Sequence, residues 1–324
     1  MNYLRVSCLG LLWWLIPLLL TSCSFADEPS VCEYNIRLEY WHAGSSLENQ
    51  LTAYVTCLRQ YIFDADGNQV EVRTLQGNEV TGWNGTLPDG TYTFVLWGNL
   101  PDETKDSDTQ AKSPSEQIKP DGAANCSKIQ LSARQEGVPP GYRGNTSRLY
   151  YGTATVDVRD GIVQRRRIYL SQAHAEISVT VRWMNDRPSE GLYRMRIKGV
   201  PALYGFTGGV QLAVPSGDGE LTLPKVEREV TYHETAAAMN YEEEVLGQFV
   251  TYRFTSGTHP LWSLWKDGEQ IIKDLDFYLF FNKLSLDLDT NTEQVFDLLV
   301  SVYEDKVVVT QVVGADWDEG GGIG

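Results

Sequence analysis

The fold class is decided by an early stretch of the chain, Cys32-Glu33-Tyr34-Asn35-Ile36-Arg37-Leu38-Glu39-Tyr40, in which apolar and polar residues alternate. Because successive side chains of a β-strand point to opposite faces, this alternation predicts a strand with one buried and one wet face. The same period of two recurs at residues 154–158, 177–183 and 284–289. Such runs favour antiparallel sheets, since strands of parallel sheets are buried on both faces.

Turn signals separate these runs and support an all-β chain. Residues suited to positive φ occur in Asp64-Ala65-Asp66-Gly67-Asn68, Pro88-Asp89-Gly90, Asp160-Gly161 and Asp267-Gly268. Helical periodicity is scarce, and a short surface helix is expected only over residues 235–246. Many short strands with frequent turns predict β-sandwiches.

The length of the chain, 324 residues, is sufficient for two domains of ordinary size. We expect the boundary near residues 171–173, where Ile168-Tyr169-Leu170 gives way to the strand that holds Ile177. This predicts an N-terminal β-sandwich domain over residues 31–172 and a C-terminal one over residues 173–324. Residues 102–120 are rich in Asp, Lys, Ser and Pro, and we expect them to form an exposed excursion from the first domain.

The N-terminus has the order of a secretory signal peptide: Arg5, an apolar run over residues 9–20, and then Leu20-Thr21-Ser22-Cys23. The apolar run is too short for a membrane-spanning helix, which needs about 20 residues. The cysteine at the expected cleavage point resembles a bacterial lipobox. On that resemblance residues 1–22 are removed, Cys23 carries an S-diacylglycerol and an N-acyl group, and residues 23–30 form a lipidated tether.

Charge and cysteine content restrict the function further. Lys and Arg number 27 against 43 Asp and Glu, for a net charge of −16. Such a surface repels nucleic acid and anionic lipid headgroups, so attachment to a membrane is expected to depend on the lipid. Cys32, Cys57 and Cys126 remain after the leader and the lipidated cysteine are set aside. Two interpretations stay open: one disulfide among these three residues, or a buried free thiol at Cys32.

The sequence contains no motif that predicts catalysis or a bound metal. The four histidines, at positions 42, 174, 233 and 259, never fall at a spacing that suits zinc. Asp287-x-Asp289-x-Asn291 begins like a calcium loop, but Thr292 and Leu298 occupy the positions of its glycine and its bidentate glutamate. We interpret that segment as the cap of a strand edge. We predict no enzymatic activity and no cofactor, and a hydrolase that uses a pair of carboxylates is the alternative.

Two further clusters have alternative interpretations. Arg165-Arg166-Arg167 is interpreted as the charged edge of a strand, with tryptic cleavage as the alternative. Tryptophans at positions 97, 183, 262 and 265 are expected mostly in the core, and Trp183 is in phase with the apolar face of its strand. Trp317, in an acidic glycine-rich tail, is expected to meet a partner. A surface that binds glycan through exposed tryptophans is the alternative function.

An ordered series of motifs resembles the fimbrium-anchoring subunits of Bacteroidota, a branch of the fimbrillin superfamily. After the lipobox and residues 32–40 come Tyr61-Ile62-Phe63-Asp64-Ala65-Asp66-Gly67, Leu87-Pro88-Asp89-Gly90-Thr91-Tyr92-Thr93 with Leu96-Trp97-Gly98, Leu149-Tyr150-Tyr151-Gly152 and Ile168-Tyr169-Leu170. In order and length the chain is similar to the anchor subunits of the minor fimbriae of Porphyromonas. The resemblance covers about the first half of the chain and is thin beyond residue 200.

The resemblance implies two transthyretin-like β-sandwich domains in tandem behind a lipoprotein signal peptide. It implies a non-enzymatic subunit that attaches fimbriae to the outer membrane, limits their length, and serves adhesion and virulence. The expected partners are a fimbrial shaft subunit, joined by strand complementation, accessory fimbrial proteins, and the outer membrane through the lipid. The expected location is the cell surface at the base of the fimbriae.

Overall fold

The computed structural model describes residues 33–42, 47–100, 116–120, 129–133, 145–185, 191–201, 203–205, 214–215, 221–222, 225–231, 233–234, 244–284, 286–291, 293–313 and 316–318. In these ranges nearly all regular structure is β, which confirms the all-β fold class. The helices are α2 (Leu51–Tyr54), α3 (Phe277–Lys283) and the 3-10 helix η1 (Gly77–Thr81). The predicted signal peptide, Cys23, the tether, Cys32 and Cys126 lie outside the described residues. No helix in the described part is both long and apolar enough to cross a membrane.

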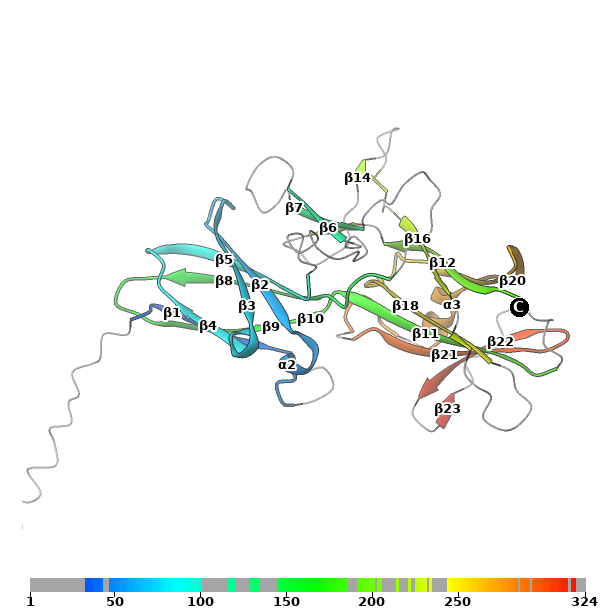
Figure 1. Ribbon diagram of the computed structural model, residues 1–324. Coiled ribbons are helices and arrows are strands. Elements are labelled where there is room, and N and C mark those ends of the chain that lie inside the picture. Colours follow the sequence, from blue (N-terminus) through cyan, green and yellow to red (C-terminus); the bar gives the residue numbers. More distant parts are fainter. Residues whose placement is uncertain are drawn as a thin grey trace, which may run out of the picture.

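Two sheets pack face to face in what we call the N-terminal lobe, residues 33–172 (Figure 1). One sheet has the order β4 (Gly82–Gly85), β1 (Ile36–Trp41) and β9 (Gln164–Tyr169). The other has the order β10 (Ser171–Gln172), β8 (Tyr150–Val158), β5 (Gly90–Gly98), β2 (Cys57–Phe63) and β3 (Gln69–Gln76). Their facing side chains, among them Leu38, Trp83, Ile62 and Phe94, form one buried cluster.

A second pair of sheets forms what we call the C-terminal lobe, residues 173–318. Its larger sheet has the order β17 (His233–Glu234), β18 (Glu244–Tyr252), β11 (His174–Trp183), β21 (Val295–Val302), β22 (Val307–Val313) and β23 (Asp316–Asp318). Its smaller sheet has the order β16 (Lys225–Thr231), β12 (Tyr193–Pro201), β19 (Leu261–Lys266) and β20 (Glu269–Asp276). Buried residues of both sheets, such as Val179, Ile197 and Trp262, belong to one core.

The predicted alternation of buried and less buried residues is clear in β11, where residues 177, 179, 181 and 183 are all buried. In the opening stretch Ile36, Leu38 and Tyr40 face the core as expected, but β1 begins only at Ile36 and leaves Tyr34 outside the strand. The turn at residues 64–68 is also confirmed. There the Asp64 carboxylate accepts hydrogen bonds from the backbone N–H groups of Asp66 and Asn68, at 3.0 and 2.8 Å.

Both lobes contain one parallel strand pair, which the expectation of antiparallel sheets did not include. β1 runs parallel to β9 in the N-terminal lobe, and β11 runs parallel to β21 in the C-terminal lobe. In each case the first strand of the lobe pairs with a strand far along the sequence. Because such pairing depends on distant segments, alternation within a single strand does not reveal it.

A third layer connects the two lobes. β6 (Glu116–Pro120) pairs with β7 (Ile129–Ala133), and β7 pairs with β13 (Leu203–Gly205), which follows β12 of the C-terminal lobe. A short hairpin, β14 (Val214–Pro215) with β15 (Leu221–Thr222), lies farther along the chain. The predicted excursion over residues 102–120 is therefore strand at its end, and its earlier part lies outside the described residues.

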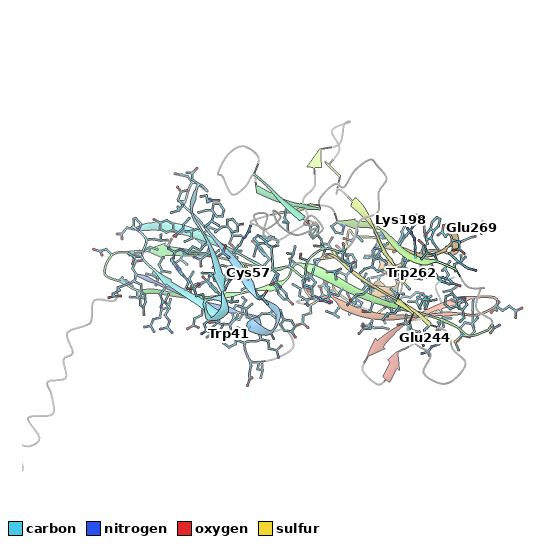
Figure 2. All side chains as sticks on the ribbon, viewed as in Figure 1. Trp41, Cys57, Lys198, Glu244, Trp262 and Glu269 are labelled. Carbon is cyan, nitrogen blue, oxygen red and sulfur yellow. The ribbon has the colours of Figure 1, made fainter. Side chains whose placement is uncertain are left out.

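The chain passes between the lobes at residues 172–174, because β10 pairs within the N-terminal lobe and β11 within the C-terminal lobe. The lobes lie end to end (Figure 1). The core of the C-terminal lobe extends into the first half of the chain, since Trp97, Leu131 and Tyr151 join its buried cluster. Figure 2 shows Cys57 close to this meeting of the lobes and Trp262 within the C-terminal lobe.

The predicted strand over residues 284–289 is wrong. The chain there leaves α3, where Phe277, Phe280 and Phe281 fall at helical spacing and are buried, and then forms a turn. The Asp276 carboxylate caps α3 by accepting a hydrogen bond of 2.9 Å from the Tyr278 N–H. Since the side-chain oxygens of Asp287 accept bonds within its own turn, the alternation of Leu with polar residues reflects loop packing.

The predicted helix over residues 235–246 is wrong at its end. Glu244, Val245 and Leu246 form the start of β18, where they pair with β11. The pairing with a long central strand overrides the helical preference of Glu and Leu. The earlier part of the predicted helix lies outside the described residues.

Candidate functional site at the junction of the two lobes

The junction is crossed by residues 145–149, which contact the C-terminal lobe before entering β8 of the N-terminal lobe. The Asn145 side chain donates to the Gln248 carbonyl and accepts from the Val250 N–H, at 2.9 Å in both bonds. The Thr146 N–H donates to the Val250 carbonyl, also at 2.9 Å. These bonds continue the edge of β18 and so attach the segment to the C-terminal sheet.

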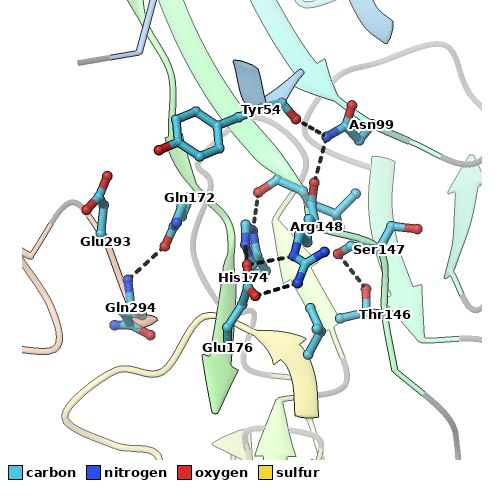
Figure 3. Close-up of polar contacts among 12 residues, drawn as sticks. Tyr54, Asn99, Thr146, Ser147, Arg148, Gln172, His174, Glu176, Glu293 and Gln294 are labelled. Carbon is cyan, nitrogen blue, oxygen red and sulfur yellow. Dashed lines mark hydrogen bonds and ion pairs between the residues drawn. The ribbon is translucent and has the colours of Figure 1, made fainter. Parts of the chain in front are cut away.

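Arg148, His174 and Glu176 form a hydrogen-bonded group at this crossing (Figure 3). Arg148 donates two hydrogen bonds of 2.8 Å to the Glu176 carboxylate. The His174 ring is fully buried and lies with Nδ1 2.7 Å from the Leu149 carbonyl and Nε2 3.1 Å from Glu176 Oε1. Burial acts to raise the pKa of Glu176, but hydrogen bonds from His174 and Arg148 outweigh it and hold the pKa at about 2.

A second buried histidine, His42, lies at the end of β1 and faces the C-terminal lobe. Its Nδ1 is 2.8 Å from the Leu170 carbonyl, and its Nε2 is 3.7 Å from a carboxylate oxygen of Glu293. The Tyr150 ring stands between the two histidines, edge to face with His42 at 5.1 Å and with His174 at 5.4 Å. Burial raises the pKa of Tyr150 to about 12, so its hydroxyl stays neutral.

Two buried glutamines complete the connection. The Gln294 backbone N–H donates to Gln172 Oε1 at 2.8 Å. Its side-chain amide accepts from the Phe254 N–H at 2.7 Å and donates to the carbonyls of Phe254 and Leu288, both at 2.9 Å. These contacts supply hydrogen-bond partners to buried polar groups.

Asn99 connects the crossing segment to the N-terminal lobe. Its φ of 60° is uncommon for a residue other than glycine. The side-chain amide donates to the carbonyls of Tyr54 and Arg148, at 2.8 and 3.0 Å, and the oxygen accepts from the Thr56 N–H at 3.1 Å. Three chain segments therefore meet at one side chain, which explains the strained conformation.

The chemistry of this junction is structural. Its carboxylates, amides and ring nitrogens are turned toward one another, and the arrangement fixes one lobe on the other. Among the described residues no group of three or more His, Cys, Asp or Glu side chains is placed to hold a metal ion. The acids of the calcium-like segment take part in local bonds, and the Asp289 carboxylate accepts from the Ser256 N–H at 2.9 Å.

The sheet edges are the other candidate site, because an open edge is a template for an added strand. β3 is an edge of the five-stranded sheet, and its Val70 and Val72 are 47% and 41% exposed. β9 is an edge of the three-stranded sheet and carries Arg165-Arg166-Arg167, all exposed, which agrees with the interpretation of a charged strand edge.

The aromatic residues and cysteines that the sequence indicated lie in different environments in the structure. Trp97, Trp183 and Trp262 are buried, as expected for core residues. Trp265 is half-buried with the Arg196 guanidinium 4.1 Å from its ring centroid. Cys57 carries a free thiol, so it forms no disulfide. Cys23 and the side chain of Trp317 lie outside what the structure describes.

The junction residues were not predicted from sequence. The spacing expected of a zinc site compares the histidines only with one another. It therefore does not indicate which other residues contact His42 and His174. One local signal was present, because His174 and Glu176 are two residues apart and so share a face of one strand. The partner Arg148 is 28 residues from Glu176, and no local pattern indicates that contact.

One known family matches the sequence of this chain over most of its length. The family described as "Fimbrillin-A associated anchor proteins Mfa1 and Mfa2" matches residues 28–319. No curated protein sequence matches the chain. Among solved structures, a candidate adhesin from Bacteroides thetaiotaomicron has a TM-score of 0.63 at 19% identity and covers 86% of this chain and 96% of its own.

A second solved structure is the fimbrial anchor protein Mfa2 from Porphyromonas gingivalis. Its TM-score is 0.57 at 17% identity, with 88% of this chain and 98% of that chain covered. At these identities the structural likeness shows a shared fold, while the family match extends over nearly the whole length. The chain therefore belongs to the family of fimbrillin-A associated anchor proteins Mfa1 and Mfa2.

Proposed function

We propose that this protein is the lipid-anchored base subunit of a fimbrium, which attaches the fimbria to the outer membrane and limits its length. The family match over residues 28–319 is the observation that carries the proposal. The lipobox-like Cys23 supplies the attachment, since two or more acyl chains hold a protein firmly at a membrane. Residues 31–172 and 173–324 act in this proposal as two sandwich domains joined in tandem. The role is mechanical and involves no catalysis.

We further propose that the fimbrial shaft subunit joins by strand complementation at an open sheet edge. β3 is suited to this role because its outer side has no neighbouring strand among the described residues and its apolar Val70 and Val72 are exposed. Backbone hydrogen bonds along such an edge provide affinity, and alternate side chains provide specificity. Accessory fimbrial proteins are further candidates for the same kind of contact.

The proposal is tested by changing the lipidated cysteine in cells that make fimbriae. We expect Cys23→Ala to move the protein, and with it the fimbriae, from the membrane fraction into the medium, because only the acyl chains hold the base. Cys57→Ala is the matched control, since it removes a free thiol that lies within the folded chain. Unchanged membrane fractionation of protein and fimbriae in the Cys23→Ala strain would refute the proposal.

A further inference from the structure

The outer face of the parallel strands β1 and β9 carries arginines, aromatic rings and one carboxylate, which we call the arginine face: Arg37, Glu39, Trp41, Arg165, Arg167 and Tyr169. Residues that pair in a parallel sheet share a face, and alternate residues of each strand return to it. Arg37 pairs with Arg165, and Trp41 pairs with Tyr169. Leu38, Tyr40 and other residues of the opposite face are buried in the lobe core.

One end of the arginine face is internally ordered. The Arg167 guanidinium lies 4.2 Å from the ring centroid of Trp41 and donates a bond of 3.0 Å to Glu39 Oε2. The Tyr169 ring meets Trp41 edge to face at 6.5 Å between centroids. Tyr169 is nevertheless 61% exposed, so this aromatic pair is held in place at the surface.

The other end of the face contains two arginines without an anion. Arg37 and Arg165 are both exposed and lie directly opposite each other across the strand pair. No salt bridge or hydrogen bond of their side chains occurs within the part of the chain that the structure describes. Like charges directly opposite in a sheet are destabilising. In a chain with 43 acidic residues, this unpaired pair points to an external anion.

We propose that the arginine face lies against the phosphate-bearing headgroups of the membrane to which the protein is tethered. The proposal rests on the proposed lipid at Cys23, from which ten residues lead to Glu33. Such a segment spans at most about 35 Å, so the first strand stays near the bilayer. Arg37 and Arg165 lie at the starts of β1 and β9, the end of the sheet that the tether reaches.

The shape and chemistry of the face agree with a membrane surface. It is the face of a sheet, and Trp, Tyr and Arg are the residues that sit at the boundary between headgroups and acyl chains. The acid-rich remainder of the chain is repelled by the same phosphates. The arginine face therefore orients the protein, and the acyl chains retain it.

The test measures orientation independently of acylation. The mature chain with Cys23→Ser is held through an N-terminal hexahistidine tag on vesicles that contain nickel-chelating lipid, phosphatidylglycerol and phosphatidylcholine brominated near the headgroup. Bromine quenches a tryptophan that approaches it, so we expect quenching that disappears in Trp41→Phe. Trp265→Phe is the matched control, because Trp265 has the same arrangement with Arg196 on the C-terminal lobe. Quenching should persist in that variant.

The charges are tested with Trp41 in place. Each arginine near an anionic surface contributes about fivefold to contact, so Arg37→Gln with Arg165→Gln should reduce the face-down population by about 25-fold. Lys273→Gln with Lys306→Gln removes the same charge from exposed sites on the C-terminal lobe and should leave quenching unchanged. Quenching should also fall when salt is raised or phosphatidylglycerol is omitted.

Three outcomes would overturn the proposal. They are equal quenching in wild type and Trp41→Phe, equal losses in the arginine and lysine double variants, and binding of soluble polygalacturonate at the arginine face without any response to vesicles. The last outcome would identify an acidic polysaccharide as the ligand. Because the tag replaces the lipid, each outcome is distinct from failure of the proposed anchoring at Cys23.

Discussion

Glu176 is the residue on which the charges of the junction converge. Its carboxylate accepts two bonds from Arg148, which belongs to the crossing segment, and one from His174, which belongs to its own strand. The Glu176 side chain is only 14% exposed and His174 is fully buried, so water screens their contact little. The Arg148 side chain is 54% exposed, so its contact with Glu176 is screened more. Loss of the carboxylate would leave a guanidinium and a buried imidazole without their shared acceptor.

We expect Glu176→Gln to lower the free energy of unfolding by about 2 kcal/mol at pH 7, as for bonds to a charged group. Folding lowers the pKa of Glu176 from 4.5 to about 2, so its contribution is complete above pH 4.5 and is lost as the pH falls toward 2. The difference between variant and wild type should therefore shrink across that window. Urea denaturation at a series of pH values measures it.

Glu244→Gln is the control for this prediction, because Glu244 pairs with Arg182 within one lobe and both side chains are about a quarter exposed. We expect it to cost no more than about 1 kcal/mol. A cost for Glu176→Gln that equals the control, or that does not change with pH, would contradict the role assigned to Glu176.

At the level of the residue, the sequence predicts which side chains are buried better than it predicts which side chains contact one another. Trp183 is predicted to be buried from its phase with Val179 and Val181, and the structure confirms it. The contact between Arg148 and Glu176 is not predictable, because it depends on how two sheets are placed end to end. Burial follows from local periodicity, whereas the junction follows from the packing of distant segments.

Among the elements, β12 shows how a single glycine shapes a sheet. Its pairing with β16 shifts register between Ile197 and Val200, and Gly199 lies at the shift with a φ of +77°. A Cβ placed on Gly199 would lie 2.7 Å from the carbonyl oxygen of His259. The irregularity therefore needs glycine both for its backbone conformation and for the close approach of a neighbouring loop.

We expect Gly199→Ala to destabilise the protein more than Gly161→Ala, although the two residues have nearly the same φ. At Gly161, with a φ of +72°, an added Cβ would meet no atom within 4 Å, so the substitution carries only the backbone cost of about 1–2 kcal/mol. Gly199→Ala adds the steric contact, a further cost of about 1–3 kcal/mol. Thermal or urea unfolding of the two variants compares them directly, and equal costs would show that the contact relaxes freely.

The elements were predicted well where one strand has one buried face, as in β11. They were predicted poorly where the apolar residues of one segment pack against different parts of the molecule, as in the segment after α3. The spacing of Phe277, Phe280 and Phe281 is helical and was a usable signal for α3. The parallel pairs were out of reach, since β1 and β9 are joined only through the tertiary fold.

At the scale of the whole molecule, the core of the C-terminal lobe extends into the N-terminal lobe. Trp97, on β5 of the N-terminal lobe, is fully buried, packs against Tyr151 with ring centroids 4.9 Å apart, and belongs to the core of the C-terminal lobe. Phe94, on the same strand, belongs instead to the separate core of the N-terminal lobe. Sequence predicts two halves and a boundary near residue 172, but it does not predict that one core extends across that boundary.

We expect the two lobes to unfold in a single cooperative transition. Trp97→Ala should lower the free energy of unfolding by about 3–5 kcal/mol and shift the whole calorimetric peak. Phe94→Ala provides the comparison, because it lies in the core that only the N-terminal lobe uses and should also shift the single peak. Two separate peaks, of which Phe94→Ala moves only one, would show that the lobes unfold independently.

The parallel pairing of β1 with β9 has a mechanical consequence. A pull on the N-terminus acts along the length of β1, which has hydrogen-bonded neighbours on both sides. To pull β1 out of the sheet, its interstrand hydrogen bonds must then break together in shear. A strand pulled at right angles to its length would lose these bonds one at a time. The direction in which the chain enters its first sheet thus suits the role proposed above, in which the N-terminus is held while the rest of the protein is pulled.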